Sequence, residues 1–286
     1  MIIEPGIYID DAGTPGVESP SVFLPESRKS WCAVIVMPKQ AHKVSTAMGM
    51  FLSGVKDEFG AEELHFSDIY SGRGLWRGVS VQKRVEIFDL MAGVFSAFGF
   101  PVFYQTASDD TYKDWPDLNN ISRLGGSEFW DLSRPAHLGL LFLVTQVRDE
   151  LLTAKLSGAL GRSEVFGIYV DEGIAKPGAK IEIPLQTKSS IADYLLFDSS
   201  LRCAGIQLAD FAAFVIARTQ WICANITGGK GVSNAEAHIL KISEKLNLFN
   251  IKRVAVNART FNKDAWEKVL TDDRRIKGLR VSRNSG

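Results

Sequence analysis

Hydrophobic residues along the chain follow two different spacings, and the two alternate from one end to the other. Alternating or continuous apolar runs predict strands at residues 7–10, 30–37, 101–107, 164–171 and 194–197. Apolar positions three and four residues apart predict helices at residues 41–59, 81–98, 135–159, 204–226 and 235–246. Strands and helices that alternate without a linker predict one α/β domain.

The segments between these elements complete the predicted organisation. Residues 108–134 contain two Trp residues and a Gly pair, and we expect them to form an irregular insertion in a single domain of residues 1–250. Residues 251–286, with a further short strand at 253–256, are predicted to form a basic C-terminal extension. From Lys252 onward this extension carries 10 Lys and Arg residues against 4 Asp and Glu residues. It either contacts phosphates or is a solvated end.

Composition and charge narrow the class of protein. The 286 residues carry a formal net charge of +0, so no overall field points to a polyanionic partner. Cys32, Cys203 and Cys223 are far apart and lie in apolar sequence, as expected for buried thiols in a reducing compartment. The N-terminus lacks the basic and long apolar regions of a signal peptide, and charged residues interrupt the longest apolar runs. We therefore expect a cytoplasmic protein with no membrane partner.

The first candidate functional residues lie in a short sequence motif that occurs twice in the chain. Residues 7–13 read Ile-Tyr-Ile-Asp-Asp-Ala-Gly, and residues 168–173 read Ile-Tyr-Val-Asp-Glu-Gly. Because side chains alternate along a strand, Asp10 shares a face with Tyr8, and Asp171 shares a face with Tyr169. Two strands that end in this way predict two carboxylates side by side at one sheet edge. A cation is needed to neutralise such a pair.

A third acid lies in the predicted helix at residues 204–226. Asp210 is the one acid in a nearly continuous apolar run, and its neighbours three and four residues away are apolar. A carboxylate on a face that packs against a sheet must be paired, hydrogen-bonded or bound to a metal. The structural alternative is a salt bridge with Arg202 or Arg218.

Glu63 and His65 are two residues apart in a short polar-apolar alternation, so they share a face if the segment is extended. Glu63 is a candidate metal ligand, and His65 is either a ligand or a proton carrier. Taken alone, each is more often a structural residue. The candidates to orient the carboxylates through hydrogen bonds are Asp11, His65, Glu172 and Gln207.

Several other reaction types are excluded because the sequence motifs that they require are absent. The second Asp of an aspartyl-phosphate phosphatase would fall at Ala12, and the chain has neither a phosphate-binding P-loop nor a Gly-x-Ser-x-Gly elbow. Four His residues without a His-x-x-x-His pair argue against a zinc hydrolase. The remaining constellation is Asp10, Glu63, Asp171 and Asp210. Carboxylates of this kind select Mg²⁺ or Mn²⁺, and two such ions can support hydrolysis of a phosphodiester.

These segments together resemble one known family. Residues 8–13, 63–65, 170–172 and 205–210 are similar to the domain-of-unknown-function-3800 (DUF3800) family of the ribonuclease H-like superfamily. The resemblance covers roughly residues 7–226. It implies an α/β fold with a mixed central sheet flanked by helices, interrupted by irregular insertions. It also implies that Asp10 lies on the central first strand, Asp171 on a neighbouring strand and Asp210 on the late helix. The family favours Asp-Glu-Ser-Gly at the opening, whereas this chain has Ala12 and lacks that hydroxyl group.

Two hypotheses on function follow from the sequence. The first is a Mg²⁺- or Mn²⁺-dependent nuclease that acts on DNA or RNA through the carboxylate constellation. The second is a catalytically silent member of the fold that binds nucleic acid or protein, in a defence or mobile-element system. The neutral net charge favours the second, because phosphate contacts normally come from Lys and Arg. The basic extension and the Lys- and Arg-bearing loops at residues 73–77 and 176–188 partly answer that objection to the first hypothesis.

Overall fold

The computed structural model describes residues 2–12, 27–161, 164–184, 191–250 and 263–276. Their strands form one seven-stranded mixed sheet in the order β5-β6-β4-β1-β2-β3-β7. The strands are β1 (Gly6–Asp11), β2 (Lys29–Val36), β3 (Pro101–Ala107), β4 (Phe166–Asp171), β5 (Lys180–Glu182), β6 (Ile191–Asp198) and β7 (Asn247–Leu248). The predicted α/β class with a mixed sheet is confirmed. The strand expected at 253–256 lies outside the described residues.

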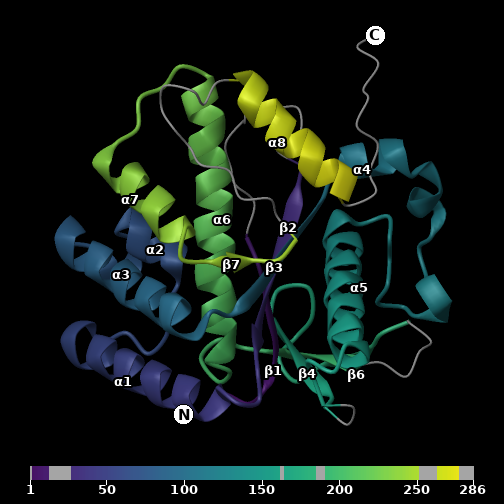
Figure 1. The fold of residues 1–286 in the computed structure, drawn as a ribbon, viewed down its shortest axis with the longest axis horizontal. Helices are drawn as coiled ribbons and strands as arrows, with labels where there is room; N and C mark the ends of the chain where they lie inside the picture. The colour runs from purple at the N-terminus through teal and green to yellow at the C-terminus, as the bar shows by residue number, and fades with distance from the viewer. Residues whose placement is uncertain (1, 13–26, 162–163, 185–190, 251–262, 277–286) are drawn as a thin grey trace.

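Helices cover both faces of this sheet (Figure 1). They are α1 (Ala41–Phe59), α2 (Phe66–Ser71), α3 (Val81–Phe98), α4 (Asp109–Asp114), α5 (Pro135–Leu156), α6 (Gly205–Thr227), α7 (Asn234–Ser243) and α8 (Lys263–Ile276). One apolar core joins α1, α2, α3, α6 and α7 to one face of the sheet. A second core joins α5 and the segment before it to the other face. Among the described residues, no helix is long and apolar enough to cross a membrane.

The direction of pairing brings three strand ends to one edge. β1 pairs with β2, and β2 with β3, in antiparallel register. β1 pairs with β4, and β4 with β6, in parallel register. Because parallel strands end at the same edge of a sheet, the carboxyl ends of β1, β4 and β6 lie next to one another.

Alternation along β1 and β4 follows the prediction. Ile7 and Ile9 enter the core beneath α5, whereas Tyr8 enters the core beneath α6. Tyr8 stacks on Tyr169 of β4, with ring centroids 5.1 Å apart. The first residue of α6, Gly205, lies against the Tyr8 ring, and a Cβ there would be 2.2 Å from a ring carbon. Glycine therefore allows α6 to approach the sheet beside this pair of rings.

Two elements were not predicted near the site. The sequence analysis predicted no regular element between residues 66 and 80, but the chain forms α2 and the 3₁₀ helix η1 (Gly74–Trp76) there. Phe66 and Ile69, three residues apart, are both fully buried and hold α2 against the core, and Gly72 ends it in a left-handed conformation with φ 64°. A third element that was not predicted, β5, forms between β4 and β6 because it pairs with β6.

Two further segments differ from simple loops. The residues predicted as an insertion, 108–134, include α4 and the 3₁₀ helices η2 (Pro116–Asn120) and η3 (Leu124–Gly126). Trp130 in this segment is fully buried, and its indole N–H donates to the Glu182 carbonyl at 2.7 Å. The segment therefore packs on the α5 face of the sheet. In the basic extension, the described part is α8, where Arg275 pairs with Asp272 one turn away at 2.9 Å.

Candidate carboxylate site

Asp10 and Asp171 lie at the ends of neighbouring parallel strands. Ile9 of β1 is in register with Val170 of β4, so the next residues along the two strands are Asp10 and Asp171. Both carboxylates follow the Tyr8 and Tyr169 positions and face α6. Asp10 is only 8% exposed, and its Oδ1 accepts a hydrogen bond of 2.7 Å from the Asp11 backbone N–H.

Asp210 approaches the same edge from α6. Its Oδ2 accepts a hydrogen bond of 3.2 Å from the backbone N–H of Phe66, at the start of α2. Neither of the arginines proposed as salt-bridge partners pairs with it. Arg202 binds Asp198, with an N–O distance of 2.5 Å, and Arg218 lies 3.5 Å from Glu236. The acid on the apolar helix face is thus hydrogen-bonded.

The pKa values of these three carboxyl groups show that their charges act on one another. Burial, then the charges of Asp210 and Asp171, raise the pKa of Asp10 well above its ordinary value. Burial chiefly raises the pKa of Asp210 to about 7, with a further contribution from Asp171, while the Phe66 N–H and His65 lower it. Burial chiefly raises the pKa of Asp171 to about 6. Burial is thus the largest cause of the raised pKa at each of the three carboxyl groups.

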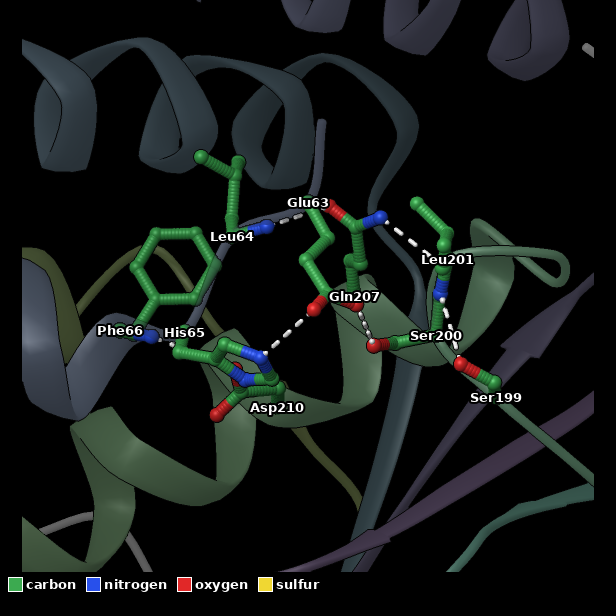
Figure 2. A network of polar contacts seen from close by, with 9 residues as sticks. All are labelled: Glu63, Leu64, His65, Phe66, Ser199, Ser200, Leu201, Gln207 and Asp210. Carbon is green, nitrogen blue, oxygen red and sulfur yellow. Dashed lines mark hydrogen bonds and ion pairs between the residues drawn. The ribbon is translucent and has the colours of Figure 1, made fainter. Parts of the chain in front are cut away.

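Glu63 has partners other than these carboxylates (Figure 2). Its Oε2 accepts a hydrogen bond of 2.8 Å from the Ser200 hydroxyl group, and its Oε1 lies 3.1 Å from Nε2 of His65. His65 is the member of this pair that acts on the acids, because its charge lowers the pKa of both Asp171 and Asp210. In this arrangement Glu63 orients His65, and its role as a metal ligand stays a prediction.

Gln207 fixes the segment that carries Glu63 and His65. Its side chain is almost fully buried, at 1% exposed. Its Oε1 accepts from the Leu64 backbone N–H at 3.1 Å, and its Nε2 donates to the Ser200 carbonyl at 3.0 Å (Figure 2). Gln207 was predicted to orient the carboxylates. In the structure it bonds to the backbone of two segments and holds both against α6.

The two acids that directly follow Asp10 and Asp171 lie differently. Asp11 forms an ion pair with Lys29 at the start of β2. Lys29 also lies over the Trp31 ring, which belongs to the core beneath α5, so Asp11 is on the sheet face opposite α6. Glu172 donates its backbone N–H to the Asp198 carbonyl at 3.0 Å.

Asp198 is an acid of this edge that the sequence analysis missed. It ends β6, in register with Asp171 of β4. Its Oδ1 accepts hydrogen bonds from Nε and Nη2 of Arg202, at 2.8 and 2.5 Å. The sequence pattern that could have identified Asp198 was present, because this acid directly follows an apolar strand, as Asp10 and Asp171 do. The predicted strand ended one residue too early, at 197.

Six of the acids at this edge, Glu172 apart, divide into two sets. The outer acids, each beside a basic side chain, are Asp11 with Lys29, Asp198 with Arg202 and Glu63 with His65. The inner acids, which accept backbone N–H groups and have no such partner among the described residues, are Asp10, Asp171 and Asp210. Among the described residues the inner acids therefore form no ion pair, although the charge of His65 favours the ionised forms of Asp171 and Asp210.

The inner acids do not form a ready coordination shell. Within the described ranges, no group of three or more His, Cys, Asp or Glu side chains is arranged to hold a metal ion. The inner carboxylates would have to draw closer together, or turn, to share one ion. Their donor chemistry nevertheless suits a hard divalent cation, since all their ligand atoms are carboxylate oxygens.

No family model, curated protein or solved structure matches the chain. The assignment of chemistry therefore rests on the geometry of the strand ends and on the partners of each acid.

Proposed function

We propose that this protein is a divalent-metal-dependent nuclease in which the inner acids bind Mg²⁺ or Mn²⁺. One observation carries the proposal. Among the described residues, the three inner acids at the edge formed by β1, β4 and β6 form no ion pair, while Asp11, Asp198 and Glu63 each lie beside a basic side chain. A buried carboxylate such as Asp10 is costly without a compensating charge. A bound cation would supply that charge.

The arrangement of elements supports a ribonuclease H-like fold and membership of the DUF3800 family. Asp10 lies on β1, at the middle of the sheet, and Asp171 ends the adjacent β4. Asp210 reaches the same edge from α6. These are the positions that the resemblance implies for the three acids. The ions, when bound, would generate a hydroxide nucleophile and stabilise the leaving oxygen of a phosphodiester.

The remaining residues of the site orient the acids. The Asp11 backbone N–H fixes Asp10, and the Phe66 backbone N–H fixes Asp210. Glu63 holds the His65 ring beside Asp210 (Figure 2). Hydrogen bonds of this kind keep ligand oxygens in place before an ion or a substrate arrives.

The proposal is tested by cleavage. Single- and double-stranded DNA and RNA are incubated with purified protein and Mg²⁺, Mn²⁺ or EDTA. We expect cleavage that requires the metal and falls at least about a hundredfold in Asp10→Asn, because the variant loses one carboxylate of the site. Asp149→Asn, which changes an exposed acid on α5, is the matched control and should cleave like the wild type.

Cleavage by Asp10→Asn at the wild-type rate would contradict the proposal, as would the absence of cleavage with every substrate and metal. Nucleic-acid or protein binding that is indifferent to Asp10→Asn, without cleavage, would favour the alternative of a silent binding protein.

A further inference from the structure

One histidine outside the carboxylate site is buried among aromatic side chains. His137 lies in the first turn of α5 and is only 3% exposed. Its ring stacks on Phe129, with ring centroids 4.8 Å apart, and its Nδ1 lies 2.6 Å from the Phe129 carbonyl oxygen. Because a carbonyl oxygen only accepts, Nδ1 carries the proton and donates it to this bond. In the neutral ring, Nε2 is then an acceptor.

The Nε2 atom of this ring is buried as well, and among the described residues it has no hydrogen-bond partner. Protonation would place a buried N–H group and a positive charge at this atom, without an acceptor for either. Burial accordingly lowers the pKa of His137. The Phe129 carbonyl and Asp131 act in the opposite direction, whereas Arg134 lowers this pKa further. The folded protein therefore favours the neutral ring.

The groups around the ring offer little compensation for a positive charge. Asp131 and Arg134, which precede α5, are the charged residues in the described part of the chain that act on it, and their effects are opposed. The Asp131 Oδ1 already accepts hydrogen bonds from the backbone N–H and the hydroxyl group of Ser133, at 3.1 and 2.6 Å. The group from β6 is apolar, because Phe197 contacts Phe129 with ring centroids 5.7 Å apart.

Phe129 belongs to residues 121–132, which we call the Trp130 segment. Trp130 is fully buried, and its indole N–H donates to the Glu182 carbonyl of β5 at 2.7 Å. Phe129 connects the segment to α5 through the histidine ring, and to β6 through Phe197, one residue before the end of that strand. The contacts of one buried imidazole therefore help to hold the segment against the end of the sheet that carries the acids.

We propose that protonation of His137 at Nε2 releases the Trp130 segment from α5 and β6. The proton has no acceptor while the segment is closed, whereas water accepts from it once the ring is exposed. An exposed imidazole titrates at about pH 6.5, so the open arrangement takes up one proton below that pH. Each further unit of pH then favours opening about tenfold, until the closed arrangement is protonated too. This step needs only a proton, so it is independent of the proposed metal site.

Hydrogen exchange of the full chain, followed by mass spectrometry between about pH 7 and about pH 5, tests this inference. The amides of α3 in the same sample correct for the pH dependence of the exchange reaction. Protection of the Trp130 segment relative to α3 should fall about tenfold per pH unit below ~6.5. His137→Asn should abolish this decline, because an Asn amide can donate to the Phe129 carbonyl but does not titrate. His42→Asn, which changes an exposed histidine of α1, is the matched control and should behave like the wild type.

Constant relative protection of the wild-type segment across this pH range would overturn the inference, as would the same decline in His137→Asn. If His137→Asn is already unprotected at neutral pH, the wild-type ring decides. Its Cε1–H resonance, assigned by its loss in the variant, is followed by NMR over the same pH range. The resonance and the protection of the Trp130 segment should change together. A ring that takes up its proton while the segment stays protected would overturn the inference.

Discussion

When no cation is bound, the charges of the inner acids lower the stability of the folded protein. The pKa of Asp210 is about 7 in the folded state, against an ordinary value of 3.8. The folded state therefore holds this proton more tightly than the unfolded chain does. The contribution of Asp210 to the free energy of unfolding is therefore highest below about pH 4 and declines as the pH rises to about 7, where its carboxyl group ionises.

Asp210→Asn should therefore stabilise the metal-free protein at neutral and alkaline pH. The variant removes the charge and keeps an oxygen that can accept from the Phe66 N–H. We expect its free energy of unfolding to exceed that of the wild type by ~2 kcal/mol at pH 8, and the difference to vanish near pH 4. Denaturant unfolding in EDTA at both pH values measures this.

The control for this prediction is Asp149→Asn, which changes an exposed acid of α5 outside the carboxylate site. A less stable Asp210→Asn protein at pH 8 would mean that its carboxylate is already neutralised within the chain.

At the residue scale, the sequence could predict which carboxylates share a face but not their partners. Asp10 and Asp171 followed from the alternation of two similar strands. Glu63 did not, because its partner Ser200 comes from a turn 137 residues away. No nearby sequence pattern links that turn to Glu63. The sequence alone therefore could not decide whether Glu63 is a metal ligand or a residue that orients His65.

At the scale of elements, the position of α6 determines where Asp210 lies. Gly205 lies against the Tyr8 ring, where a Cβ would be 2.2 Å from a ring carbon. Gly205→Ala should displace the start of α6 or the ring, with a loss of stability of ~2 kcal/mol from overpacking. Because Asp210 is one and a half turns further along the helix, metal-dependent cleavage should fall as well.

Gly54→Ala is the matched control for this substitution. Gly54 lies within α1, and a Cβ there would meet nothing within 4 Å. Alanine favours a helix over glycine by roughly 1 kcal/mol, so this variant should be as stable as the wild type or more stable. Equal thermal stability of Gly205→Ala and Gly54→Ala would contradict the close approach of α6 to Tyr8.

Long periodic elements were predictable, and short ones were not. The helices α1, α3, α5 and α6 and the strands β1 to β4 follow from their apolar spacing. The short helix α2 and the strand β5 depend on contacts with distant segments, namely the core beneath α6 and the pairing with β6. Local propensity is a weak guide to such elements because tertiary contacts decide them.

At the scale of the whole molecule, the convergence of the acids is a product of topology. Parallel pairing of β1, β4 and β6 brings Asp10, Asp171 and Asp198 to one edge, and α6 adds Asp210. The sequence could predict a sheet and the acids, but not the strand order, because that depends on pairings between distant segments. The division into inner and outer acids also required the structure.

The most direct test of this account is the binding of Mn²⁺, measured by isothermal titration calorimetry without any nucleic acid. We expect the wild type to bind the ion and Asp10→Asn to bind it at least about a hundredfold more weakly, since a ligand is lost. Asp198→Asn, which changes an outer acid already paired with Arg202, should lose less than about tenfold. Equal affinities of the wild type and Asp10→Asn, or an equal loss in both variants, would contradict the assignment of the metal to the inner acids.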